Sequence, residues 1–224
     1  YNNYLINISK LWLDKLLPEY KVILWLDADT WVQDRAALDC LFAAAEHRSV
    51  AIVPEIGAKM TDLLAVRWIM PGWVQVRSFL YKNATHARLS FSIRKQIAVK
   101  PLLNAGVFCL RQDTEHWEIF RKWQRVIIEN GGSIFTNDQL SIALSVYIDG
   151  MAVTLLDNSH NYIGPWIIDD KTNKLVSLFY PHKPIGIVHL ASQKKIRDSI
   201  ENKIGIYTTT GKIVMRNLRY PSFS

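Results

Sequence analysis

The feature that most constrains this 224-residue chain is an apolar run that ends at two aspartates. The run KVILWL covers residues 21–26, and Asp27-Ala28-Asp29-Thr30 follows directly. A continuous apolar run of this length is typical of a strand buried on both faces, as in α/β proteins. Ligands of open α/β sheets bind where strands end, so both carboxylates stand at a position suited to binding or catalysis.

Carboxylates two residues apart point to opposite faces of an extended chain, so these two converge only if the chain turns beyond the strand. Converging carboxylates repel one another unless a cation lies between them. Hard divalent ions such as Mg²⁺ and Mn²⁺ prefer oxygen ligands and often bridge to phosphates. The structural alternative is that Asp29 caps the next turn while Asp27 pairs with a lysine.

Apolar periodicity and capping residues predict helices and strands in alternation along the chain. The predicted helices cover residues 9–17 with Ser9 as N-cap, 35–47 opened by Asp34, 114–130 capped by Asp113 or Thr114, and 137–148. The predicted strands cover residues 50–54, 102–110 with a break at 104–106, 153–156 and 185–190, with a terminal hairpin at 206–216. This alternation predicts an α/β fold.

Residues 57–100 carry an unusual charge for their length. Eight basic residues stand there against Asp62 alone, which gives a balance of +7, while the whole chain has a net charge of +7. Such a segment favours anionic partners: phosphates, acidic glycans or anionic lipid surfaces. The segment shows no firm period, and we expect an insertion of short helices and loops. No recognised nucleic-acid motif is present, so no nucleic-acid partner is expected.

Neither the apolar runs nor the cysteines point to a membrane-spanning or disulfide-stapled protein. No run reaches the roughly 18 residues that a spanning helix requires, and no signal-peptide pattern opens the chain. Cys40 and Cys109 are too few for a disulfide framework and are expected to be buried. These features predict a cytoplasmic protein, with peripheral contact at a membrane left open.

Two enzyme classes place an Asp-x-Asp pair at the end of a strand. In phosphatases of the haloacid dehalogenase class, Asp27 would be the nucleophile and Asp29 a general acid/base. Their later acidic motif has no good counterpart, because Asp169-Asp170 lacks the expected glycine. In metal-dependent glycosyltransferases with a GT-A fold, both aspartates handle a metal ion on the donor's diphosphate.

Four segments in sequence decide between these classes. They are Ser9-Lys10-Leu11 before VILWLDADTWV, the segment LNAGVF at 103–108, Asn137-Asp138-Gln139, and the strand IVHL at 187–190. In this order they resemble glycosyltransferase family 8, which includes glycogenin and bacterial galactosyl- and glucosyltransferases. The resemblance covers most of residues 4–195. It implies a GT-A-like, Rossmann-like fold with a mixed, mainly parallel sheet flanked by helices.

The resemblance also implies roles for individual residues. Asp27, Asp29 and His189 would bind Mn²⁺ or Mg²⁺. The donor, expected to be a UDP-sugar, would be held by Lys10, Asp27, Ala28, Asp29, Asn104, Ala105, Gly106, Lys194 and Lys195. Asp138 and Gln139 would act at the sugar as catalytic residues. The reaction would be a metal-assisted hexosyl transfer with retention of anomeric configuration.

The sequence departs from the family at two places. The family continues from its late histidine into a G-x-x-K-P-W segment, whereas His189 is followed here by LASQKK. The family's opening nucleoside-binding strand has no counterpart, so the expected fold is incomplete at its N-terminus. A catalytically inactive, glycosyltransferase-like binding domain is therefore an alternative.

The acceptor side is expected in the basic, aromatic segment 57–100. Aromatic rings stack on sugars and basic groups hold acids, which makes Trp68, Trp73 and Arg77 the candidate acceptor residues. The expected acceptor is a glycan, lipid or protein, and an anionic glycan or glycolipid would suit the charge. We expect one catalytic domain over residues 1–224, with 57–100 as the insertion and 200–224 as a C-terminal hairpin and tail.

Overall fold

The apolar run ahead of Asp27 forms a strand, as predicted, in a computed structural model that describes residues 5–56, 64–191, 193–197, 199 and 201–219. The helices are α1 (Leu5–Ser9), η2 (Lys10–Trp12), α2 (Leu13–Leu16), α3 (Ala36–Glu46), α5 (Phe79–His86), α6 (Phe91–Ile97), α7 (His116–Glu129), η3 (Ile134–Thr136), α8 (Asn137–Tyr147), η4 (Asn158–His160) and α9 (Lys194–Arg197). The strands are β1 (Val22–Leu26), β2 (Thr30–Val32), β3 (Val50–Pro54), β4 (Leu64–Met70), β5 (Trp73–Ser78), β6 (Leu103–Arg111), β7 (Val153–Leu155), β8 (Trp166–Ile168), β9 (Leu175–Ser177), β10 (Ile187–His189), β11 (Ile204–Tyr207) and β12 (Ile213–Arg216).

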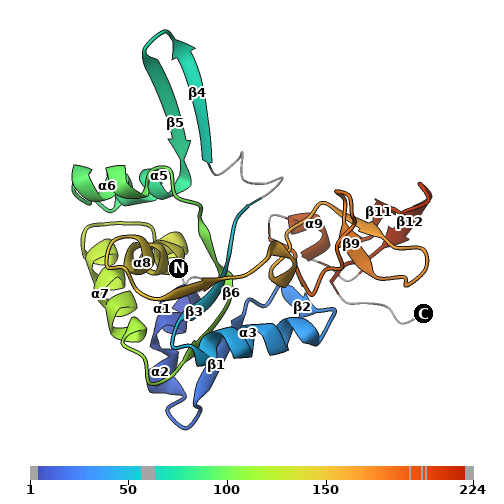
Figure 1. Cartoon of the computed structure of the whole chain (residues 1–224), viewed down its shortest axis with the longest axis horizontal. Helices are drawn as coiled ribbons and strands as arrows, with labels where there is room; N and C mark the ends of the chain where they lie inside the picture. The colour runs from blue at the N-terminus through green and yellow to red at the C-terminus, as the bar shows by residue number, and fades with distance from the viewer. Residues whose placement is uncertain (1–4, 57–63, 192, 198, 200, 220–224) are drawn as a thin grey trace.

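The central sheet is mixed and has the strand order β1-β6-β3-β7 (Figure 1). Strand β6 is antiparallel to both β1 and β3, while β3 and β7 are parallel. The prediction of an α/β fold is confirmed, but the prediction of a mainly parallel sheet is wrong for the strand pairs. The chain leaves the sheet beyond Pro54 and re-enters beside it at Leu103, so β6 must run back along β3.

Both faces of the sheet are covered by helices, which explains why its strands are apolar throughout. Phe108 and Leu110 of β6 pack in one core cluster with Trp117 of α7 and Ile142 of α8. The alternate β6 residues Val107 and Cys109 pack on the opposite face, in a cluster that contains the α3 residues Ala37, Leu41, Ala44 and Ala45. This period of two follows from strand geometry.

Two predicted details at element ends are wrong. Residues 9–17 do not form one helix: Ser9 ends α1 and is the N-cap residue of the short η2, but its hydroxyl donates to the Ile6 carbonyl and makes no capping bond. Neither Asp113 nor Thr114 caps α7: the N-cap residue is Glu115, without a side-chain bond. Asp34 does accept a hydrogen bond from the Ala36 amide at the start of α3, as expected.

The predicted break at 104–106 is a bulge within a continuous strand. Ile52 pairs with Phe108 and Val53 with Asn104, so the register between β3 and β6 shifts at this point. Bulges re-aim side chains beside functional sites. Here the shift lies where β6 passes Asp27, whose amide donates to the Gly106 carbonyl.

The segment 57–100 is more regular than predicted. Residues 57–63 lie outside the described part, but β4 and β5 form an antiparallel hairpin that projects from the body and leads into α5 and α6 (Figure 1). Its turn runs through Pro71 and Gly72, and Gly72 has φ +83°, as the third position of a type II turn requires. The expected short helices are present as α5 and α6, but the strands β4 and β5 were not expected, although a Pro-Gly turn between two apolar runs is a hairpin signal.

The C-terminal third packs small sheets beside the end of β1. Strand β2 pairs with β10, β8 with β9, and β11 with β12, which confirms the predicted terminal hairpin. One core cluster joins this region, with Tyr162, Trp166, Val188 and Ile206 among its members. Cys109 is buried as expected, whereas Cys40 is exposed on α3. Within the described residues, no helix combines the length and apolarity needed to cross a bilayer.

Candidate active site

A tight turn after β1 brings the two aspartates together. The amide and hydroxyl of Thr30 both donate to the Asp27 carbonyl, at 2.9 and 2.7 Å. The chain then reverses into β2, whose residue Thr30 pairs with His189 of β10. As a result, oxygen atoms of Asp27 and Asp29 and a ring nitrogen of His189 lie within 4.8 Å of one another. The turn that convergence required is therefore present.

Asp29 lies between two basic groups. Its Oδ1 is 3.3 Å from His189 Nε2, and its Oδ2 accepts a hydrogen bond from Arg197 at 3.4 Å. Burial alone would raise the pKa of Asp29, but its contacts with His189 and then Arg197 outweigh burial and lower it. Asp29 is therefore a carboxylate at neutral pH, as a metal ligand must be.

The ring of His189 is held by a second side chain. The buried Asn161 accepts a hydrogen bond from His189 Nδ1 at 2.7 Å. Because an amide oxygen only accepts, Nδ1 carries a proton in this pair, and Nε2 is left either to share a proton with Asp29 or to bind a metal ion. Nε2 is the atom that faces Asp29. An imidazole fixed in this way by its other nitrogen is the usual arrangement of a metal-binding histidine.

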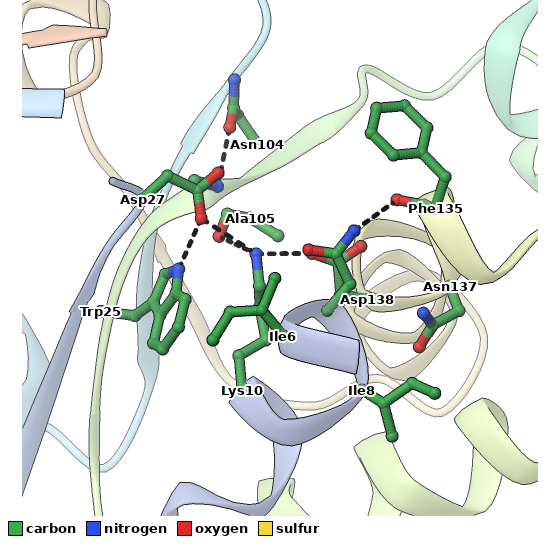
Figure 2. Close-up of polar contacts among 12 residues, drawn as sticks. Ile6, Ile8, Lys10, Trp25, Asp27, Asn104, Ala105, Phe135, Asn137 and Asp138 are labelled. Carbon is green, nitrogen blue, oxygen red and sulfur yellow. Dashed lines mark hydrogen bonds and ion pairs between the residues drawn. The ribbon is translucent and has the colours of Figure 1, made fainter. Parts of the chain in front are cut away.

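A buried lysine occupies the other side of Asp27 (Figure 2). Lys10 is 1% exposed and contacts Asp138 Oδ2 at 2.7 Å, Asp27 Oδ1 at 3.2 Å and the Ala105 carbonyl at 3.3 Å. The indole of Trp25 donates to the same Asp27 oxygen at 2.7 Å. Burial alone would lower the pKa of Lys10, but the Asp138 and Asp27 carboxylates outweigh it and raise the pKa. Lys10 is therefore a fixed cation inside the protein.

Asp138 is the most deeply buried acid of the site. Burial raises its pKa, against the opposing effect of the Lys10 ammonium group. Its Oδ2 contacts Lys10, whereas its Oδ1 is buried without a hydrogen-bond partner in the described part of the chain. A buried polar atom without a partner is costly, and such atoms are often found where a ligand binds.

The bulge in β6 shapes the floor of the site. The Asn104 side chain accepts from the Gly106 amide at 2.8 Å and donates to Glu55, which follows β3. A Cβ atom at Gly106 would overlap with the His189 ring and lie 3.0 Å from Asp27 Oδ2. Only glycine allows β6 to pass this close to both predicted metal ligands.

These side chains line one cleft of about 470 Å³. Its lining includes Lys10, Asp27, Asp29, Glu55, Asn104, Asp138, Gln139, His189 and Arg197. A second hollow of about 500 Å³ is lined by Trp25, Asp27, Ala28, Asp29, Arg197 and Arg219, among others. The two hollows share Asn7, Asp27, Asp29 and Arg197, so both aspartates stand between them. Volumes of this size suit a substrate or cofactor.

The structure brings most of the predicted donor, metal and catalytic residues into these hollows. Ala105 contributes its carbonyl to Lys10, and Ala28 lines the second hollow. Lys194 and Lys195 belong to α9, but their side chains lie outside what the structure describes, as does that of Trp68 on β4. Trp73 and Arg77 are exposed on the hairpin β4–β5 and line neither hollow.

Four residues of the site were not predicted. Arg197 lies two residues beyond Lys195, so the basic run after His189 pointed to the right segment but the wrong residue. Glu55 directly follows strand β3, just as Asp27 directly follows strand β1, so the strand-end signal that selected Asp27 also applied to Glu55. Trp25 and Asn161 act on Asp27 and His189 through hydrogen bonds, and no local pattern marks them.

A scan against models of protein families finds no match for this chain, and a search of curated proteins finds none either.

Proposed function

We propose that this protein is a retaining glycosyltransferase that moves a hexosyl unit from a nucleotide-sugar with the help of a divalent metal ion. The observation that carries the proposal is the convergence of Asp27, Asp29 and His189 at the mouth of a cleft that also holds the Lys10–Asp138 pair. Two carboxylates and one imidazole suit Mn²⁺ somewhat better than Mg²⁺. The GT-A arrangement and the likeness to family 8 belong to this proposal.

Asp27, Asp29 and His189 would hold the ion, and the Asn161 hydrogen bond would keep His189 Nε2 directed at it. When bound, such an ion neutralises charge on a leaving diphosphate. Asp27 is suited to this task because Lys10 and Trp25 engage its Oδ1, while its Oδ2 lies on the side of Gly106 and His189.

The other cleft residues would hold the two ends of the donor. Arg197 of α9 contacts Asp29 and would attract a diphosphate, with Lys194 or Lys195 of the same basic segment as further candidates. Asn104 and Gln139 would hydrogen-bond sugar hydroxyls. Asp138 would face the anomeric carbon, where positive charge develops as the bond to phosphate breaks.

Retention leaves two routes for the Asp138 carboxylate. In one, the acceptor attacks on the face that the diphosphate leaves, and Asp138 stabilises the charged sugar. In the other, Asp138 forms a covalent intermediate. The 2.7 Å contact with Lys10 favours the first route, because an ammonium group on Oδ2 makes the carboxylate a weaker nucleophile.

The phosphatase alternative has less support. Asp169 and Asp170, the nearest match to its second acidic motif, lie in an exposed turn after β8 and line neither hollow. Asp169 bonds to Thr172, and Asp170 accepts from the Thr210 amide. Both acids therefore have local structural roles.

Calorimetry with UDP in the presence and absence of Mn²⁺ tests the proposal. We expect binding that requires Mn²⁺ and is lost in Asp29→Asn, while Asp39→Asn, an exposed acid of α3, binds as the unmodified chain does. Hydrolysis of UDP-glucose and UDP-galactose should show the same dependence. Absence of both Mn²⁺-dependent binding and hydrolysis would contradict the proposal.

Two further outcomes would assign the chain to an alternative class. Release of phosphate from an aryl phosphate, abolished in Asp27→Asn, would favour the phosphatase. Binding of UDP and Mn²⁺ without hydrolysis or transfer to any acceptor would favour the inactive binding domain.

A further inference from the structure

The hairpin β4–β5 has one apolar and one basic face. Residues directly opposite in an antiparallel pair lie on the same face. Val66 pairs with Val76, whereas Arg67 pairs with Gln75 and Ala65 with Arg77. Alternation over 64–68 and 74–78 therefore separates the valines from the arginines, and a bulge between Trp68 and Met70 interrupts it next to the turn.

The apolar face is not covered by the described part of the protein. Val66 is 56% exposed, Val74 44% and Val76 41%. Beyond the bulge, the pair Met70 and Trp73 adds exposed apolar surface at the tip of the hairpin, at 55% and 67%. The hairpin projects away from the sheet and its helices (Figure 1). A two-stranded hairpin with an exposed apolar face is marginal in water, so this face is suited to a partner that covers it.

The charge around the hairpin indicates what that partner is. Its exposed arginines are Arg67 and Arg77, and the helices α5 and α6 at its base, with the residues that follow them, add the exposed residues Lys82, Arg88, Lys95 and Lys100. In the described residues none of these six forms an ion pair with an acid, and Asp62 is the sole acidic residue of 57–100. A second copy of the chain would bring the same positive charge and be repelled.

We propose that the hairpin β4–β5 docks this protein on an anionic lipid surface. Val66, Val76, Met70 and Trp73 enter the boundary between head groups and acyl chains, where tryptophan is favoured. Arg67 and Arg77 bury their aliphatic stems and extend their charged ends to lipid phosphates. The proposal does not depend on the chemistry of the cleft. If the cleft is a glycosyltransferase site, docking of the hairpin on a membrane places that site beside lipid-borne acceptors.

Flotation with vesicles tests this directly. We expect the full chain to float with vesicles of phosphatidylglycerol and phosphatidylcholine, to float poorly with phosphatidylcholine alone, and to be released by high salt. The double variant Val66→Ser/Val76→Ser should weaken binding about tenfold through lost apolar contact. Arg67→Gln/Arg77→Gln should weaken it roughly 30-fold on anionic vesicles, as expected for two basic residues near such a surface.

The hairpin β11–β12 supplies a matched control. Ile213 and Met215 are 61% and 57% exposed on β12, so Ile213→Ser/Met215→Ser makes an equivalent change elsewhere. This variant should bind vesicles as the unmodified chain does. Circular dichroism would check that every variant is folded, and UDP titration would check that the cleft is unchanged.

Three outcomes would overturn the proposal. They are failure to float with anionic vesicles, equal loss of flotation in the control variant, and a dimer in solution that Val66→Ser/Val76→Ser dissociates. The last result would assign the apolar face to a second copy of the chain. None of these results bears on UDP binding, so the two proposals can fail separately.

Discussion

The cleft has two halves, which differ in the cations that contact their aspartates. Asp27 and Asp138 have a counter-ion supplied by the protein, because the ammonium group of Lys10 lies between them, buried at 3.2 and 2.7 Å. Asp29 has only the longer contacts to His189 and Arg197, at 3.3 and 3.4 Å, and Arg197 is exposed. The first half already contains its cation, whereas the second is suited to accept one. We infer that Lys10 mainly stabilises the fold of the site, while Asp29 and His189 mainly bind a ligand.

The largest effect should follow from removing Lys10. Breaking a buried ion pair by deleting one partner leaves a buried charge, at a cost of about 3–5 kcal/mol. We expect Lys10→Met to lower the free energy of unfolding in urea by that amount. Lys15→Met, which changes an exposed lysine of α2, should alter it by less than about 1 kcal/mol. Equal stability of the two variants would remove the distinction between the halves.

Removing the Asp29 carboxylate should change stability little and metal affinity strongly. Its contacts are weak and its neighbour Asp27 repels it, so Asp29→Asn should change the stability of the metal-free protein by less than about 1 kcal/mol. Affinity for Mn²⁺, measured by calorimetry, should fall by at least about 100-fold, with Asp39→Asn as the control. A large loss of stability in Asp29→Asn together with unchanged Mn²⁺ affinity would show that Asp29 stabilises the fold rather than binds the ion.

A smaller effect should come from Asn161, which contacts His189 and not the proposed ion. Loss of a residue that orients a metal ligand typically costs about 10- to 100-fold in metal affinity. We expect Asn161→Ala to lower Mn²⁺ affinity about tenfold, while Asn158→Ala, in η4, leaves it unchanged. If Asn161→Ala binds Mn²⁺ normally, the hydrogen bond to His189 has only a structural role.

The smallest effect should come from His116, a buried histidine outside the cleft. Its Nε2 donates to the Ala152 carbonyl at 2.8 Å, and burial lowers its pKa from 6.5. The unfolded chain therefore takes up a proton first as the pH falls, and stability is lost below about pH 6.5. Between pH 7 and pH 5.5, His116→Gln should lose less stability than the unmodified chain, by at most about 1.4 kcal/mol. If urea unfolding shows an equal loss of stability in His116→Gln and in the unmodified chain between pH 7 and pH 5.5, this assignment is contradicted.

The sequence predicted the parts of the fold that have strong local signals. The apolar runs of β1 and β3 and the period of α7 were read correctly, because each pattern spans the whole element. The direction of β6 could not be read, because it depends on where the chain returns after residue 100. The hairpin β4–β5 was missed because Ala65 and Ile69 interrupt the apolar and polar alternation of β4, so the segment shows no firm period.

The candidate site was predicted to a similar depth. Asp27 and Asp29 were named from a strand end and His189 from the resemblance to family 8, and the structure brings the three side chains together. Glu55 and Arg197 were not predicted as site residues, because their partners Asn104 and Asp29 are distant in the chain and meet them only in the folded structure. Lys10 was named as a donor contact. Its ion pair with Asp27 matches the structural alternative that Asp27 pairs with a lysine, whereas no spacing predicts its pair with Asp138.

The passage of β6 beside His189 and Asp27 has a consequence for interpreting mutational scans. Any side chain at position 106 would displace the imidazole or the carboxylate, even though glycine itself offers no functional group. A saturation scan of this chain would therefore rank position 106 with the acids and the histidine. The substitutions tolerated at a position depend on the space left by neighbouring side chains as well as on the chemical role of the residue.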